Sequence, residues 1–198
     1  MQIIDTGAQK QKIREKLLMK RKGLSSYDYK SVNKQILHRL VHLDTFKKAQ
    51  TIHIYLPIVK QKEVDTLPVI GSLLEKGKNV VVPITEFDRI ALRHVALDNM
   101  EDLKTNRWGV PEPVQQIDID IQELDLVIVP MVGGDMHGNR LGYGKGYYDS
   151  FLKEVNCPKI GLLPETCLVD NIPVEEHDVP LDYLITEDRI IRARGQGR

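Results

Sequence analysis

Residues 125–130 read Asp-Leu-Val-Ile-Val-Pro, and residues 138–149 read Gly-Asn-Arg-Leu-Gly-Tyr-Gly-Lys-Gly-Tyr-Tyr-Asp. The first run is typical of a buried strand, and the second predicts a glycine-rich loop that leads into a helix. Glycines at this density let backbone N–H groups approach a ligand without interference from Cβ atoms. Arg140 and Lys145 add positive charge, and Asp149 is a candidate ligand for a divalent cation. The pattern predicts a phosphate-binding loop with a metal ligand at its end, although such glycines can also serve only as turns.

Outward from this loop, short apolar strands alternate with helices in both directions along the chain. Strands are predicted over 51–56, 79–83, 90–97, 125–130, 159–163 and 182–186. Helices are predicted over 7–22, after Ser25 and Ser26, over 67–76 and over 146–155. This alternation predicts an α/β fold, in which helices cover both faces of a parallel-rich sheet. Ligands bind beyond the carboxyl ends of strands in such sheets, and the glycine loop occupies such a position.

The bulk composition is that of a soluble globular protein. The chain has 198 residues, enough for one well-buried core, and its 28 basic and 28 acidic side chains cancel. This balance argues against general binding to nucleic acid or to anionic membranes. The only cysteines are Cys157 and Cys167, which do not form a disulfide framework. Because no apolar run is long enough to cross a bilayer and no signal peptide is recognisable, we expect a cytoplasmic protein.

Several common site types are excluded by spacing. The loop lacks the Gly-Lys-Ser/Thr of a Walker A motif, because Gly146 follows Lys145. It also lacks the Gly-x-Gly-x-x-Gly spacing of dinucleotide-binding loops. His177 has no cysteine or histidine partners at zinc-site spacing, and no Gly-x-Ser-x-Gly is present. A zinc site and a covalent serine or cysteine mechanism therefore have no support.

The predicted first helix carries many basic side chains and only a thin apolar side. Thr6 is a candidate N-cap, and Gly23 suits the position just past its end. One interpretation is a solvated basic helix. The other is that Lys10 and Arg14, four residues apart on one helical face, contact an anion together.

Three further segments contain candidate site residues, each with a plainer alternative. Glu63 precedes a predicted helix that Asp65 or Thr66 can cap, so it can simply be exposed. Trp108 is the only tryptophan and stands among Arg, Gly and Pro, which is a poor context for a core residue. Asp178 offers a second carboxylate for a metal ion, or belongs to a surface turn before the last strand.

Taken together, these segments resemble one known family. The run over 140–149 closely resembles the glycine-rich loop of the 5-formyltetrahydrofolate cyclo-ligases, also called methenyltetrahydrofolate synthetases. Four other segments are similar to motifs of that family, in the family's order: residues 10–14, 63–66, 107–113, and His177-Asp178 with Asp182. The similarity spans about residues 10–190.

The resemblance implies a fold and a reaction. The implied fold is a three-layer α/β/α sandwich of the type shared with sugar-phosphate isomerases and CoA transferases. It forms a single domain over 1–190, followed by a basic tail over 191–198 that we expect to be solvated. The implied reaction is the ATP- and Mg²⁺-dependent closure of 5-formyltetrahydrofolate to 5,10-methenyltetrahydrofolate, with release of ADP and phosphate. In the family mechanism the formyl oxygen attacks the γ-phosphate, and N10 then displaces phosphate from the resulting imidate.

The resemblance also implies roles for particular residues, and we expect a monomer. The residues implied in catalysis are Lys145, Tyr147 and Arg140. Those implied in ATP binding are Lys10, Arg14, Arg140, Gly142, Gly144, Lys145, Gly146 and Tyr148. Those implied in folate binding are Glu63, Trp108 and Tyr147. The implied metal ligands are Asp149 and Asp178.

The chain departs from the family pattern at two places, and two other functions stay open. Met131 stands where the family has a glycine, Gly134 replaces an aromatic residue, and residues 164–167 also differ. These changes concern the closure of the pterin pocket and the affinity for substrate. One alternative function is a folate or nucleotide binder without turnover. The other, an RNA-contacting module, is disfavoured by the neutral net charge.

Overall fold

The computed structural model describes residues 5–86, 91–106 and 110–193. Their main sheet has seven strands in the order β12-β11-β9-β6-β1-β2-β3. The five inner strands are parallel, and the strand at each edge is antiparallel to its neighbour. The bounds are β1 (Thr51–Ile54), β2 (Asn79–Glu86), β3 (Ala91–Leu97), β6 (Leu126–Val129), β9 (Lys159–Leu162), β11 (Tyr183–Ile185) and β12 (Ile190–Arg192).

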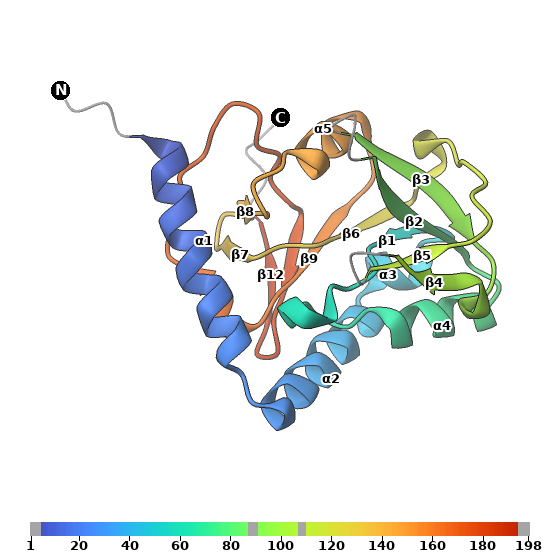
Figure 1. The fold of residues 1–198 in the computed structure, drawn as a ribbon, viewed down its shortest axis with the longest axis horizontal. Helices are drawn as coiled ribbons and strands as arrows, with labels where there is room; N and C mark the ends of the chain where they lie inside the picture. The colour runs from blue at the N-terminus through green and yellow to red at the C-terminus, as the bar shows by residue number, and fades with distance from the viewer. Residues whose placement is uncertain (1–4, 87–90, 107–109, 194–198) are drawn as a thin grey trace.

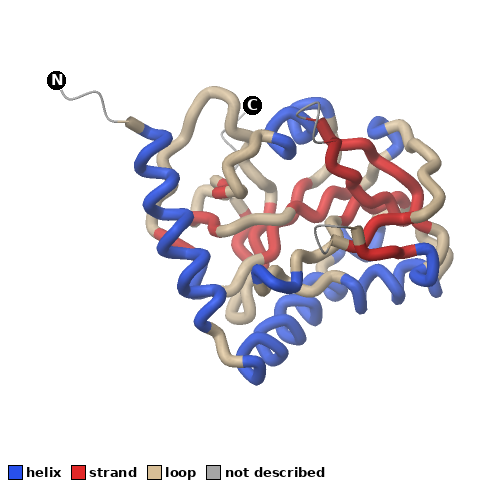
Figure 2. Tube along the Cα trace, viewed as in Figure 1, coloured by secondary structure: helices blue, strands red, loops and turns tan. Residues whose placement is uncertain are grey.

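Helices cover both faces of this sheet, and each face has its own core (Figure 2). On one face Ile52, Leu126 and Ile128 pack with α2 (Ser26–His42), α3 (Asp44–Lys48) and α4 (Leu67–Glu75). On the other face Val127 and Val129 pack with α5 (Tyr147–Glu154) and with α1 (Thr6–Gly23). Successive residues of β6 therefore belong to opposite cores, as the pleat of a strand requires. The predicted α/β/α sandwich is confirmed.

Smaller elements surround the sandwich (Figure 1). A second sheet joins β10 (Leu168–Val169), β7 (Gly133–Asp135) and β8 (Arg140–Leu141), and it lies beside α1. A hairpin pairs β4 (Leu103–Thr105) with β5 (Pro111–Pro113). The short 3₁₀ helices are η1 (Val59–Gln61), η2 (Met100–Asp102), η3 (Ile121–Glu123) and η4 (Glu165–Cys167). In the described residues no helix is long and apolar enough to span a membrane.

Details of the predicted elements differ from the structure at their ends. The N-cap of α1 is Asp5, whose carboxylate accepts a hydrogen bond from the Ala8 N–H, rather than Thr6. Gly23 is the last residue of that helix instead of the one after it. Strand β12 continues the main sheet to Arg192, past the predicted domain boundary at residue 190, because residues 186–189 turn the chain back along β11. Residues 194–198 lie outside the described part.

A pair of histidines, one buried and one half-buried, lies between the sheet and α5. His53 on β1 is fully buried, and its Nε2 lies 3.2 Å from Nδ1 of His94 on β3. The Phe151 ring packs against both imidazoles. Burial lowers the pKa of His53 well below its usual value and lowers that of His94 to about 4. Both rings are therefore neutral at pH 7.

We expect this pair to make the fold sensitive to acid. Because the folded-state pKa values are lowered, the unfolded chain binds more protons as soon as the pH falls below about 6.5, and stability is lost from there downward. The fully buried His53 alone should make the free energy of unfolding about 2 kcal/mol lower at pH 5 than at pH 7. Urea unfolding at both pH values should show that His53→Phe reduces this difference. An unchanged difference in the variant would contradict the assignment.

Candidate active site

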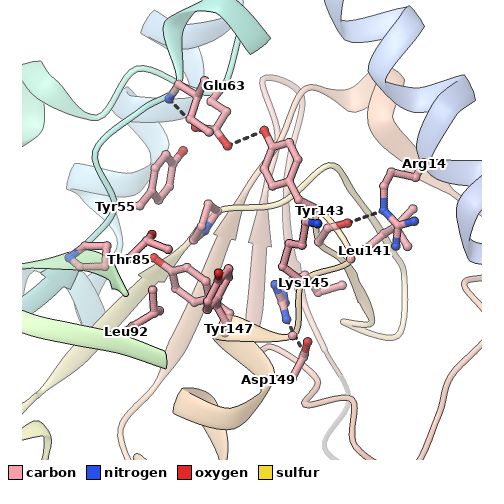
Figure 3. Close-up of a pocket in the computed structure, with 18 of the residues that line it drawn as sticks. Arg14, Tyr55, Glu63, Thr85, Leu92, Leu141, Tyr143, Lys145, Tyr147 and Asp149 are labelled. Carbon is pink, nitrogen blue, oxygen red and sulfur yellow. Dashed lines mark hydrogen bonds and ion pairs between the residues drawn. The ribbon is translucent and has the colours of Figure 1, made fainter. Parts of the chain in front are cut away.

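A cavity of about 660 Å³ opens where the carboxyl ends of β1, β2 and β6 meet the glycine loop (Figure 3). Strands β2 and β6 flank β1 on opposite sides, so the chain reverses its direction of sheet growth here, which is the usual ligand position in such folds. The sheet contributes Tyr55, Pro83, Thr85 and Pro130 to the wall. The loop contributes residues 140–149, and α1 contributes Gly7, Lys10 and Arg14.

The glycine loop is held open by its backbone conformation and by α1. Gly144 and Gly146 have φ of +82° and +75°, a region that side chains disfavour. The carbonyl of Gly142 accepts a 2.8 Å hydrogen bond from Nε of Arg14. The Arg14 guanidinium also lies 3.1 Å from the position that a Cβ on Gly144 would take. Arg14 thus fixes the loop to α1 and brings its own charge to the cavity.

Arg140 joins β8 to the start of α5. Its side chain is only 5% exposed, forms an ion pair with Asp149, and lies 5.8 Å from the ring centre of Tyr148. Among the described residues, Arg140 Nε and the Tyr148 hydroxyl are buried polar atoms without a hydrogen-bond partner. Burial raises the pKa of Tyr148, so this hydroxyl stays protonated and can donate. Two unused donors at a cavity wall are suited to an anionic ligand.

Lys10 forms ion pairs with two carboxylates at the same cavity. Its Nζ lies 2.6 Å from both Glu175 Oε2 and Asp178 Oδ2, and the lysine is 7% exposed. His177 adds a nitrogen, and the ligand atoms of these three neighbours lie within 4.8 Å of one another. The Lys10 ammonium group lies between the two carboxylates, whose oxygens are ligands of the kind that Mg²⁺ prefers. The donor set therefore fits a magnesium ion. Asp149, the other predicted ligand, is paired with Arg140.

Glu63 is a buried acid at this cavity, with only 3% exposure, so the exposed alternative is wrong. One carboxylate oxygen accepts a 2.6 Å hydrogen bond from the Ile58 N–H, and the other accepts one of 2.6 Å from the Tyr143 hydroxyl. Burial raises the pKa of Glu63 above its usual value, and these two bonds and the Arg21 charge offset only part of that rise. The Thr66 hydroxyl does not cap α4, because it donates to the Tyr55 carbonyl.

The departures from the family pattern are accommodated away from the cavity. Met131 is 2% exposed and is not among the described lining residues. Its Cε and Sδ lie 2.8 and 2.4 Å from where Cβ atoms on Gly134 and Gly161 would stand. The methionine thus fills space that two glycines leave free. Cys167, in the other departing segment, is buried against Leu17 of α1.

The structure brings nearly all the predicted site residues together. The cavity is lined by Lys10, Arg14, Glu63, Arg140, Gly142, Gly144, Lys145, Gly146, Tyr147, Tyr148, Asp149 and Asp178. Trp108 lies outside the described residues.

The sequence interpretation missed Arg21, Tyr143 and Glu175. Arg21 follows Leu17 by four residues, so its place on the buried stripe of α1 was a usable signal.

Comparison with known proteins agrees with this geometry. The model of the 5-formyltetrahydrofolate cyclo-ligase family matches residues 6–187. A probable 5-formyltetrahydrofolate cyclo-ligase of Schizosaccharomyces pombe is 31% identical over 79% of this chain and 84% of its own. The mouse cyclo-ligase is 28% identical over 95% of this chain and 98% of its own. The structure of Aquifex aeolicus 5,10-methenyltetrahydrofolate synthetase, 32% identical, covers 96% of this chain and 94% of its own, with a TM-score of 0.82. The chain therefore belongs to the 5-formyltetrahydrofolate cyclo-ligase family of enzymes.

Proposed function

We propose that this enzyme closes 5-formyltetrahydrofolate to 5,10-methenyltetrahydrofolate in a reaction that consumes ATP and requires Mg²⁺. The observation that carries the proposal is a single cavity with cations on the glycine loop and α1 and a buried acid, Glu63, elsewhere in its wall. Figure 3 shows Glu63 and Asp149 at opposite ends of the drawn residues. The end at Glu63 suits a neutral ring with N–H groups, and the end at Asp149, next to Arg140, suits a phosphate donor.

The cations explain how an unreactive amide is activated. An amide oxygen is a poor nucleophile and a poor leaving group, so positioning and neutralisation of phosphate charge must supply most of the catalysis. Arg14 and Arg140 are fixed by their contacts, and Lys145 is exposed at the loop tip. We infer that they hold the triphosphate in line with the formyl oxygen. Transfer of the γ-phosphoryl group gives a phosphorylated imidate, and attack by N10 then expels phosphate.

The remaining roles follow from position. Asp178, with Glu175 beside it, and Asp149 would hold Mg²⁺, which would neutralise phosphate charge when bound. Lys10, now between these carboxylates, then becomes available to the triphosphate. Tyr147 lines the cavity at the start of α5, where we place it next to the formyl group. Both cysteines are free thiols, which supports the cytoplasmic location that we expect.

Turnover can be followed by the strong absorbance of the methenyl product. Wild-type protein with 5-formyltetrahydrofolate, ATP and Mg²⁺ should produce it. Lys145→Ala should lower kcat about 100-fold, because one cation is lost at the developing phosphate charge. Lys153→Ala is the matched control, since Lys153 lies on α5 but does not line the cavity, and its activity should be that of wild type.

Two outcomes would contradict the proposal. If wild type gives no rise in absorbance while ATP and reduced folate both bind tightly, the protein is a binder without turnover. If Lys145→Ala turns over at the wild-type rate, the loop tip does not carry the chemistry.

A further inference from the structure

A buried chain of hydrogen bonds reaches Glu63 from the first helix. Arg21 on α1 is 2% exposed and donates from Nε to the Gln61 carbonyl at 2.8 Å and from Nη1 to the Met131 carbonyl at 2.9 Å. Its Nη2 donates to the Tyr143 hydroxyl at 2.6 Å. That hydroxyl in turn lies 2.6 Å from Glu63 Oε1. Arg21 therefore ties the segment around Glu63, the end of β6 and the glycine loop together.

The donors in this series of hydrogen bonds fix the direction of each bond. A guanidinium has no acceptor, so Tyr143 must accept from Arg21 and use its single proton toward Glu63. The Ile58 N–H, which contacts the other Glu63 oxygen, is also only a donor. Both carboxylate oxygens are thus approached by donors, and a proton on the lone pair that either donor uses would displace that bond. An ionised carboxylate accepts both bonds as they stand, and the bond from Tyr143 is then charge-assisted.

We infer that Tyr143 and Arg21 are positioning residues that keep Glu63 ionised and in one orientation, so that it can only accept hydrogen bonds from the ligand. Each carboxylate oxygen can accept two bonds, which leaves free lone pairs for the cavity. The site then selects a ring edge with N–H donors, such as the pterin edge of 5-formyltetrahydrofolate. This inference rests on the proposed function for the identity of the ligand.

No other titratable group described near Glu63 takes over the role of Tyr143 and Arg21. The Tyr29 hydroxyl of α2 donates to the Glu63 backbone carbonyl at 2.6 Å, away from the carboxylate. Tyr55 donates to the Val64 carbonyl, and burial raises its pKa and that of Tyr148, so neither adds charge. Asp65, on the helix side of the segment, contacts the Leu67 N–H. Arg21 is the cation linked to the Glu63 carboxylate among the residues that the structure describes.

The test compares two tyrosine variants that each lose one bond to the same residue. Tyr143→Phe removes the donor to the carboxylate but keeps the ring beside Arg21, and Tyr29→Phe removes the donor to the backbone. We expect Tyr143→Phe to raise KM for 5-formyltetrahydrofolate about 10- to 30-fold with kcat within about threefold, since a charge-assisted bond is lost. The inflection of KM against pH should move up by about one pH unit. Tyr29→Phe should change neither.

A second measurement needs no turnover. Infrared difference spectra of wild type minus Glu63→Gln, without substrate, report whether Glu63 is ionised. We expect the ionised band at pH 7 in wild type and in Tyr29→Phe, and its loss at a higher pH in Tyr143→Phe than in wild type. If wild type makes no methenyl product but the bands behave so, the positioning role stands and the proposed function fails. A protonated Glu63 in wild type at pH 7, or the same KM profile in both tyrosine variants, would overturn the inference.

Discussion

Arg140→Ala is expected to lower turnover of 5-formyltetrahydrofolate by about 10²- to 10³-fold, the range for removal of one preorganised charge donor. Arg140 is held firmly at the cavity, because the Asp149 carboxylate and the Tyr148 ring fix its buried side chain. Its Nε is buried and has no hydrogen-bond partner among the described residues. The variant also leaves Asp149, the proposed metal ligand, without its counterion, so it disturbs both parts of the proposed ATP site.

Steady-state kinetics of two further variants separate charge from geometry. Arg140→Lys keeps the charge but loses the planar group, and it should fall between wild type and Arg140→Ala. Arg189→Ala is the matched control: it also removes an arginine paired with a carboxylate, here Glu165, at a place that does not line the cavity. It should retain wild-type turnover. An Arg140→Ala enzyme with more than about a tenth of wild-type activity would remove Arg140 from the catalytic set.

The inner part of the fold was predictable because its strands are buried on both faces. The run that became β1 alternates, those that became β6 and β9 are mostly apolar, and the structure moves their ends by one or two residues only. Two peripheral elements, β12 and the β4–β5 hairpin, were not predicted. Their strands are short and partly polar, and each pairs with a neighbour only a few residues away along the chain. The intrinsic preference of so few residues carries little information about such pairing.

The site was predictable where chemistry and spacing coincide, as in the glycine loop and in the Lys10–Arg14 pair. It was harder to predict where a side chain acts through a distant partner. Arg21 looked like one more basic residue on a solvated helix, yet it is buried and bonded to Tyr143, which is 122 positions later. Tyr143 itself looked like a loop residue beside glycines. A single sequence does not show that a buried charge has three acceptors.

Gly138→Ala is expected to give the largest loss of stability. Gly138 turns the chain from β7 into β8 with φ of +84°, and a Cβ there would stand 2.5 Å from the Leu181 carbonyl oxygen. The obstacle is backbone, and the Gly138 carbonyl accepts the Leu181 N–H at 2.9 Å, so the two segments cannot separate without breaking that bond. Strain in the left-handed region and overpacking together should lower the free energy of unfolding by about 3 kcal/mol.

Gly71→Ala is the matched control, because it makes the same chemical change where nothing opposes it. Gly71 lies inside α4, and no atom lies within 4 Å of its prospective Cβ. Alanine there should raise the free energy of unfolding by about 0.5–1 kcal/mol through helix propensity. Urea unfolding of both variants should therefore give shifts of opposite sign. Since Arg140 follows Gly138 by two residues, folded Gly138→Ala protein should also lose turnover, whereas Gly71→Ala should not. Equal stabilities for the two variants would show that the hairpin yields to the added methyl group, and that its conformation does not depend on glycine.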